Sequence, residues 1–266
     1  MTEMTNKLIV PVEWLGAQVI EKLKGLGAFS TFTAKVFYWM VRPPFRIKLL
    51  FDQLYFIGNK SIFIVALTAS FSGAVMAYQT YLGFKLISAD SFIGPIVAIG
   101  LAKELAPVLA GLIVAGRVGA AIAAHIGTMK VTEQVDALEV MGVDSVQYLA
   151  IPRVVAATLA LPMLSAIFLL IGNIGSWLVG TKVLQIDEVI YFSKVSAFMH
   201  VQDIIEGLIK AFFFGFLISV IACFHGFRVE GGAEGVGRGT NMAVVWGMVI
   251  CLVVDFFLTS FLVHVL

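Results

Sequence analysis

Long apolar stretches fill most of the chain after residue 60, and polar residues gather between them. A transmembrane helix needs about 20 predominantly apolar residues to cross the hydrocarbon core of a bilayer. Five stretches reach that length, covering about residues 61–84, 92–125, 149–180, 204–224 and 240–262. The pattern therefore predicts an all-α integral membrane protein with five transmembrane helices.

The stretch at 92–125 is longer than one crossing requires, and its first half contains residues that interrupt an apolar helix. These residues are Gly94, Pro95, Lys103, Glu104 and Pro107. Helix interruptions at membrane depth are tolerated where the backbone is buried in protein or lines a cavity. We therefore expect a broken or re-entrant helix that leads into a true span from about residue 106. A less favoured interpretation counts two crossings here and six in total.

The N-terminal region is predicted to lie on the membrane rather than to cross it. Residues 11–41 place apolar side chains at helical spacing, with charged residues on the other faces and aromatic residues suited to the headgroup level. Pro43 and Pro44 end this amphipathic interfacial helix. We expect residues 1–56 to form that helix and a linker, and residues 57–266 to form the transmembrane domain.

Composition and charge narrow the class of protein and its orientation. Hydrophobic residues make up 60% of the chain and charged residues 13%, which excludes an ordinary soluble domain. The net charge of +1 gives no reason to expect a nucleic-acid partner. Eight Lys or Arg residues precede residue 61, whereas the loop after the first span carries only Lys85. The positive-inside rule therefore predicts a cytoplasmic N-terminus, cytoplasmic loops at 126–148 and 225–239, and a C-terminus outside.

Ionisable residues inside the apolar stretches are the first candidates for function, because each costs about 2.5–3.5 kcal/mol on insertion scales. Glu104 is adjacent to Lys103, but neighbouring helical residues point in different directions. Arg117 lies roughly 20 Å further along a straight helix, so it meets Glu104 only if the chain turns near Pro107. We favour a functional role for Glu104 over a passive pair. Lys210 and Asp255, on adjacent antiparallel spans, are predicted to form a structural ion pair.

Two further patterns concern helix contacts. Small residues recur every fourth position at Ala115, Gly119, Ala123 and Gly127, which permits close helix packing either between two copies or within one chain. The following segment, 130–142, is too polar to span but carries apolar residues at helical spacing. Such a segment is either a solvated loop or a short helix that docks on a soluble partner. The four histidines are scattered and lack the spacing of a metal site.

The run from Glu104 to Gly142 resembles the signature region of the MlaE/YrbE family, the permease subunits of ABC-type lipid transporters that work with MCE proteins. The matching elements are Glu104-Leu105-x-Pro107-Val108, Ala115-Gly116-Arg117-x-Gly119, Ile126-Gly127-x-Met129, Thr132-Glu133-Gln134, Asp136-Ala137-Leu138 and Gly235-Val236-Gly237-Arg238 with Ala243-Val244-Val245. The similarity covers about residues 10–266. Gly239-Thr240-Asn241 departs from the Ala-Thr-Thr expected there.

The resemblance implies a homodimer in a bacterial inner membrane, bound by an ABC ATPase and a STAS-domain protein inside and by an MCE-domain ring outside. Its substrate would be glycerophospholipid, moved along a periplasmic path that supports outer-membrane lipid asymmetry. The resemblance puts Lys103, Glu104 and Arg117 near the lipid path. It also favours cavity lining over interfacial anchoring for residues of the first span, namely Val75, Met76, Tyr78, Gln79, Tyr81 and Leu82. Coupling to the ATPase would use Glu133, Gln134, Val135, Asp136, Leu138, Glu139 and Met141.

The chain is not expected to be an enzyme. No G-x-x-x-x-G-K-[ST] motif is present, so ATP and Mg²⁺ would be bound by the partner ATPase and this chain would need no cofactor or metal. Two rival functions stay open. One is an ion-coupled secondary transporter that uses Glu104 and Arg117 as a proton relay, and the other is a membrane scaffold for an MCE ring.

Overall fold

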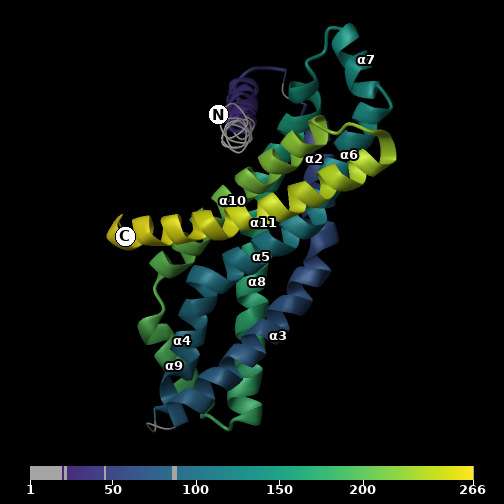
Figure 1. The fold of residues 1–266 in the computed structure, drawn as a ribbon. Helices are drawn as coiled ribbons and strands as arrows, with labels where there is room; N and C mark the ends of the chain where they lie inside the picture. Colours follow the sequence, from purple (N-terminus) through teal and green to yellow (C-terminus); the bar gives the residue numbers. More distant parts are fainter. Residues whose placement is uncertain (1–19, 21–22, 45, 86–88, 266) are drawn as a thin grey trace, which may run out of the picture. The chain divides into compact units, whose positions relative to one another are not determined.

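The computed structural model describes residues 20, 23–44, 46–85 and 89–265, and the chain divides into two units, Met1–Pro44 and Phe45–Leu266. The described residues are helical, with no strand among them, and include five runs long and apolar enough to cross a membrane (Figure 1). These runs are Ile47–Phe84, Asp90–Val131, Val146–Val183, Val201–Phe227 and Gly232–Leu262. The predicted all-α membrane fold with five spans is confirmed.

In the first unit, residues 23–40 form a helix that ends before the two prolines at 43 and 44. Part of the amphipathic helix predicted at 11–41, namely residues 11–19 and 21–22, lies outside the described residues. In the second unit, α2 (Ile47–Ile57) leads into α3 (Asn59–Phe84) through Gly58, whose backbone is also helical. The first apolar run therefore starts at Ile47, before residue 61, because the helix continues through Gly58 and Lys60.

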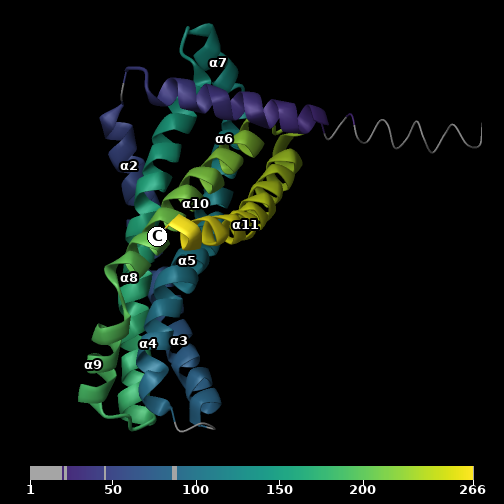
Figure 2. The same cartoon turned by 90° about the vertical axis from the view of Figure 1, so that its left-hand side faces the viewer.

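The second run is a single helical path whose interruptions are two π-helical segments. It comprises η2 (Asp90–Phe92), α4 (Ile93–Gly100), the π segment η3 (Leu101–Leu105), α5 (Ala106–Val114), the π segment η4 (Ala115–Gly119) and α6 (Ala120–Val131). The chain bends but does not reverse, as Figure 2 shows from α4 to α6. π segments are rare and often occur at functional sites. The expected interruption near Pro107 is present, without a re-entrant loop.

The remaining elements include the predicted short helix after the second run and the last three predicted spans, together with a short helix, α9, that was not predicted from the sequence. They are α7 (Gln134–Val140), the π segment η5 (Val146–Ala150), α8 (Ile151–Leu178), the π segment η6 (Val179–Val183), α9 (Glu188–Phe198), α10 (Val201–Phe227) and α11 (Gly232–Val265). The short helix α9 packs beside α4, at the end of the bundle far from α7 (Figure 1). Its Tyr191 hydroxyl lies 3.0 Å from the hydroxyl of Ser176, which joins α9 to α8.

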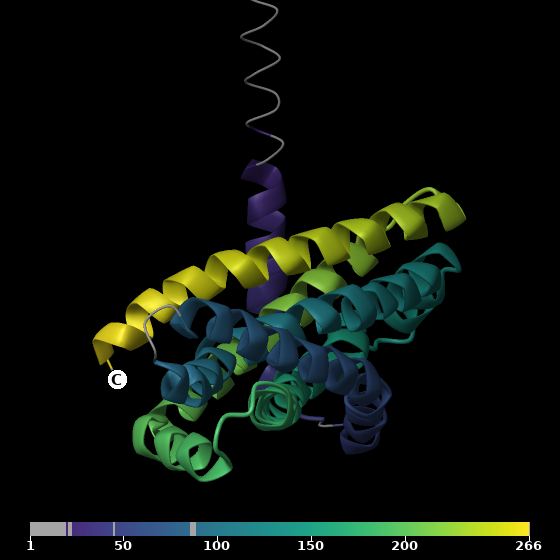
Figure 3. The same cartoon turned by 90° about the horizontal axis from the view of Figure 1, so that it is seen from below.

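Glycine brings α3 and α8 into direct backbone contact. A Cβ atom on Gly73 would lie 1.9 Å from the carbonyl oxygen of Gly172, and one on Gly175 would lie 2.4 Å from that of Ser70. Such contacts suit a lipid environment, where helix association depends on close packing rather than on burying apolar surface from water. Helix α11 lies on the outside of the same unit, as the view from below shows (Figure 3).

The small-residue ladder packs inside one chain. Ala115 and Ala123 are fully buried, a Cβ on Gly119 would contact Ile218 of α10 at 3.7 Å, and one on Gly127 would lie 2.8 Å from Val229. Of the two arrangements that the spacing permits, the structure shows packing within one chain, because the surface of the ladder is occupied by the chain's own helices.

We predict that Gly73→Val lowers the stability of the protein by about 1–3 kcal/mol or more, because the added side chain would overlap backbone rather than a movable side chain. Thermal unfolding of the purified full chain in detergent measures the effect. Gly83→Val on the same helix is the matched control, since a Cβ there meets nothing within 4 Å. Equal stability of the two variants would show that α3 and α8 are not held at this distance.

Candidate functional site

A fully buried lysine, Lys210 of α10, is the centre of a charged cluster inside the membrane-spanning bundle. Its ammonium lies 2.7 Å from Oε1 of Glu104 and donates to Oγ1 of Thr259 at 2.7 Å. Asp255 Oδ1 lies 3.7 Å away, and Glu206 Oε1 lies 3.9 Å away. Because a buried ammonium is costly unless it is paired and hydrogen-bonded, these oxygens from three helices stabilise Lys210 together.

The backbone of the π segment η3 supplies another ligand. In an α-helix the N–H of residue 107 would bond to the carbonyl of Lys103, but Pro107 has no N–H. Lys210 Nζ donates to that carbonyl oxygen at 2.9 Å. The proline and the lysine therefore act together, since one leaves a backbone acceptor free and the other satisfies it.

A glycine on α10 allows this approach. A Cβ on Gly207 would lie 2.1 Å from the carbonyl oxygen of Ala102, so α10 touches the backbone of η3 directly. The contact sets the depth at which Lys210, one turn further along α10, meets Glu104.

The second half of the cluster surrounds Lys103. Its ammonium lies 2.9 Å from Glu206 Oε2 and 3.2 Å from Asp203 Oδ1. Asp203 also accepts a hydrogen bond from the backbone N–H of His200 at 2.8 Å, which caps the start of α10. Sequence reasoning missed Asp203 and Glu206, although their spacing of three and four residues from each other and from Lys210 places all three on one helix face.

The cluster contains more acidic than basic groups. Four carboxylates, from Glu104, Asp203, Glu206 and Asp255, share two lysine ammonium groups. One oxygen of Glu206 and one of Asp255 are buried without a hydrogen-bond partner within the described part of the chain. The Glu104 side chain is 41% exposed, whereas that of Lys210 is completely buried. The cluster therefore opens toward the surroundings of the chain at Glu104.

Arg117 is held elsewhere. Its guanidinium donates to Ser61 Oγ at 2.7 Å and lies over the ring of Phe56, with the carbon 5.6 Å from the ring centre. Glu104 is paired with Lys210 instead. Glu104 and Arg117, which the rival proton-relay hypothesis joins, therefore have separate partners among the described residues. They do not meet because the helix between them does not turn back.

The residues of α3 that were expected to line the lipid cavity lie on two different faces of the helix. Val75, Tyr78 and Leu82 are each about half exposed and follow one another along one face, and Gln79 is also exposed. Met76 points inward, since its methyl carbon lies 2.8 Å from where a Cβ of Gly100 would be. Tyr81 is partly buried, with the Lys85 ammonium 5.4 Å from its ring centre. No hydrogen bond or ion pair links these described side chains to Glu104.

The predicted coupling segment forms α7 and projects beyond α6 (Figure 1). Lys130 and Asp136 pair at 2.6 Å, and Ser145 donates to Glu139 at 2.8 Å, which fixes both ends of the segment. Val135 is buried within the chain, so it is not free to contact a partner. Glu133 and Gln134 are exposed where the helix starts, and Leu138 is partly exposed. The most exposed apolar residues are Met141 and Val140, of which Val140 was missed.

None of the described residues forms a group of three or more His, Cys, Asp or Glu side chains that could hold a metal ion. The acidic groups of the cluster are instead directed at lysine ammonium groups. The site is therefore a polar cluster of four carboxylates and two lysine ammonium groups within an apolar bundle.

Comparison with known proteins assigns the family. Residues 50–261 match the model of the family described as Permease MlaE. This chain belongs to the MlaE permease family. A relative from Rickettsia bellii, named "Probable ABC transporter permease protein", is 45% identical over 92% of this chain and 95% of its own length. The "Intermembrane phospholipid transport system permease protein MlaE" of Haemophilus influenzae is 36% identical over the same shares of both chains.

The family consists of ABC permease subunits, which are not catalytic. A chloroplast relative from Arabidopsis thaliana, TRIGALACTOSYLDIACYLGLYCEROL 1, is 39% identical over 79% of this chain and 60% of its own length. The family model includes the whole cluster from Lys103 to Asp255, so the cluster lies in the shared region of these permeases.

We predict that Lys210→Met destabilises the protein by about 3–5 kcal/mol, because the change leaves buried carboxylates without their cation. Thermal unfolding in detergent measures this loss. Lys85→Met is the control, since Lys85 is exposed at the end of α3. Adding Glu104→Gln to Lys210→Met should recover part of the loss. A Lys210→Met variant as stable as the control would contradict the cluster's structural role.

Proposed function

We propose that this chain is the permease subunit of an ABC-type phospholipid transporter, with Glu104 at the edge of the lipid path. The observation that carries the proposal is the half-exposed Glu104 carboxylate, which lies in a membrane-spanning helix and is attached to a buried charged cluster. A carboxylate kept at that depth is expensive, and it is retained where it faces a polar cavity or a pathway.

The surroundings of Glu104 suit a ligand that is polar at one end and apolar at the other. On α11, Asp255 and Thr259 face the cluster, while Phe256, Phe257 and Phe261 are 71%, 65% and 63% exposed. Charged groups and large apolar side chains thus lie within a few residues of each other. A phospholipid, with its charged headgroup and acyl chains, has the complementary chemistry.

The proposal includes a homodimer. The exposed phenylalanines of α11 and the exposed residues of α3 leave apolar surface uncovered on both of these helices. A second copy that packed near α11 would enclose Glu104 and convert an open surface into a cavity. Val75, Tyr78 and Leu82 on the exposed face of α3 would then line the acyl-chain part of that cavity.

Coupling to ATP hydrolysis would pass through α7. With the N-terminus in the cytoplasm, as the positive-inside rule predicts, α7 also lies on the cytoplasmic side. An ABC ATPase that docks there would bind the ATP and Mg²⁺. When the ATPase closes, it would move α6, and the π segments η4 and η3 of the same run would pass that motion to the charged cluster around Lys210. Leu138, Val140 and Met141 are the apolar residues of α7 that a partner could reach.

The resemblance to the MlaE/YrbE family extends the proposal to location and further partners. The complex would lie in a bacterial inner membrane with the C-terminus outside, bind a STAS-domain protein on the cytoplasmic side, and meet an MCE-domain ring in the periplasm. Phospholipid transport along that path would support outer-membrane asymmetry. The proposal keeps the predicted division into an interfacial helix and linker at residues 1–56 and a transmembrane domain at residues 57–266.

We predict that Glu104→Gln lowers ATP-driven phospholipid transfer by about tenfold, because it keeps the side chain's shape but removes its charge from the proposed path. The assay follows labelled lipid leaving proteoliposomes that contain the chain and its ATPase. Glu234→Gln, an exposed acid at the start of α11, is the control. Unchanged transfer by a well-folded Glu104→Gln complex would exclude a charge-dependent role, whereas reduced stability with unchanged transfer would indicate only a structural one.

We also predict that Leu138→Asp or Met141→Asp abolishes coprecipitation of the ATPase while membrane insertion is unaffected, because a docking surface cannot desolvate the new charge without a cost of several kcal/mol. Val183→Asp is the control, since Val183 is equally apolar and exposed but belongs to η6, at the other end of α8. If the ATPase binds both α7 variants as well as the control, α7 is not its docking site.

A further inference from the structure

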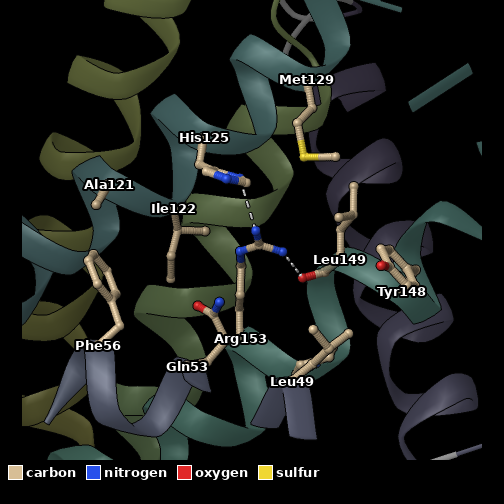
Figure 4. A pocket seen from close by; sticks show the side chains of 11 residues that line it. Leu49, Gln53, Phe56, Ala121, Ile122, His125, Met129, Tyr148, Leu149 and Arg153 are labelled. Atoms are coloured by element: carbon tan, nitrogen blue, oxygen red, sulfur yellow. Dashed lines mark hydrogen bonds between the residues drawn. The ribbon is translucent and has the colours of Figure 1, made fainter. Parts of the chain in front are cut away.

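A cavity lies away from the charged cluster. It has a volume of about 570 Å³, is partly open to the outside, and is lined by residues of α2, α6, η5 and α8 (Figure 4). Most of its walls are apolar, with Leu49, Ile122 and Leu149 among them, and no Asp or Glu lines it. It shares no residue with the cluster around Lys210. A large apolar cavity in a membrane-spanning bundle has room for part of a lipid.

A buried arginine points into this cavity. The Arg153 residue is only 7% exposed, and Figure 4 shows its guanidinium at the centre of the lining residues. It donates to the carbonyl oxygen of Leu149, in the π segment η5, and its Nη2 lies 3.0 Å from His125 Nδ1. No carboxylate of the described residues lies within 4 Å of it. Arg153 is thus a buried cation with neutral partners.

Two neutral partners do not balance a buried positive charge. A guanidinium has five N–H donors in a planar fork and no acceptor, so Arg153 keeps donors beyond the two bonds that these partners receive. Buried charges are normally paired with an opposite charge. Among the described residues the guanidinium therefore has no anionic partner, and the cavity beside it is the space in which an anion can lie.

The neighbouring polar groups also suit an anion. Because arginine can only donate, His125 Nδ1 accepts the bond from Arg153, so its hydrogen is on Nε2 and that atom is a further donor. Gln53 and Tyr148 add an amide and a hydroxyl to the wall. The guanidinium of Arg46 lies over the Tyr148 ring at 4.2 Å, which brings a second positive charge to this side of the cavity.

We propose that this cavity binds a phosphate group through Arg153 and His125, and that a membrane phospholipid carries the phosphate. Arginine matches a phosphate with two parallel hydrogen bonds. The apolar walls favour a carrier with acyl chains over a free ion. The position is also suitable, because Arg153 is the third residue of α8 and His125 lies six residues before the end of α6. Both are near the ends of their membrane runs, at the level of lipid headgroups.

This site is distinct from the proposed transport path and holds whether or not Glu104 contacts the transported lipid. A lipid bound here would contact α2, α6 and α8 at once, so it would join the first, second and third membrane runs at the end that carries α7. The expected consequence is that the lipid headgroup stabilises the part of the bundle from which α7 projects.

Photo-cross-linking tests the site locally. The photoreactive residue p-benzoylphenylalanine replaces Leu49 in the full chain, which is purified in detergent with isotope-labelled dioleoylphosphatidylglycerol or dioleoylglycerol. Inorganic phosphate and unlabelled phosphatidylglycerol are added to the phosphatidylglycerol sample as competitors. We expect cross-linked phosphatidylglycerol in intact-mass spectra, and much less cross-linked dioleoylglycerol. Arg153→Gln should reduce the phosphatidylglycerol product about tenfold, as expected for loss of a charge-assisted hydrogen-bond pair.

Three further variants make the result specific. Arg228→Gln, an exposed arginine at the same end of the bundle, should keep the wild-type yield. Ala121→Phe, which fills the cavity without changing charge, should lose the product even if Arg153→Gln fails to fold. Glu104→Gln should keep the yield, so a failure of the transport proposal would not be mistaken for a failure of this site.

Three results would count against the proposal. Equal yields from Arg153→Gln and Arg228→Gln would overturn the role of the arginine. Equal labelling by dioleoylglycerol would show that the phosphate is not recognised. Competition by millimolar inorganic phosphate as strong as that by added phosphatidylglycerol would leave a phosphate site but overturn a lipid as its carrier.

Discussion

The bundle depends on a lysine ammonium that no water can reach. Lys210 is fully buried, and its oxygen ligands come from η3 and α11 as well as from its own helix α10. None of these helices can shift far without uncovering a charge at membrane depth. The cluster therefore determines which helix faces meet, and it places Glu104 at the edge of the bundle with its carboxylate paired to Lys210.

Much of the fold followed from hydropathy because a bilayer imposes a length on every crossing. The five spans, the interruption near Pro107 and the family membership were all predicted. Lys210 and Asp255 were expected to pair, and their side chains lie 3.7 Å apart. The partners of Lys103 were not foreseen. Asp203 and Glu206 precede or begin the predicted fourth span, where charged residues usually face water, whereas the helix starts at Val201 and brings both against η3.

Other features could not be read from the sequence because one pattern is compatible with two arrangements. Small residues at every fourth position permit close contact with any helix, and α10 and α11 occupy that surface here. Val135 has the spacing of a docking residue on α7, but it is buried, while Val140 is 89% exposed. Hydropathy gives the apolar positions, and only the packing shows which of them remain free.

The four π segments have a consequence for how such a chain can change over time. Each contains bonds that reach five residues back, so each behaves as an α-helix with one extra residue. Losing one residue from η3 or η4 would restore a regular α-helix and leave the later side chains of that run in nearly their present directions, because the wide turn completes about the same rotation with one more residue. Arg117 and His125 would then keep their present partners. The loss would be confined to the wide turn itself, which at η3 includes the Lys103 carbonyl that accepts from Lys210.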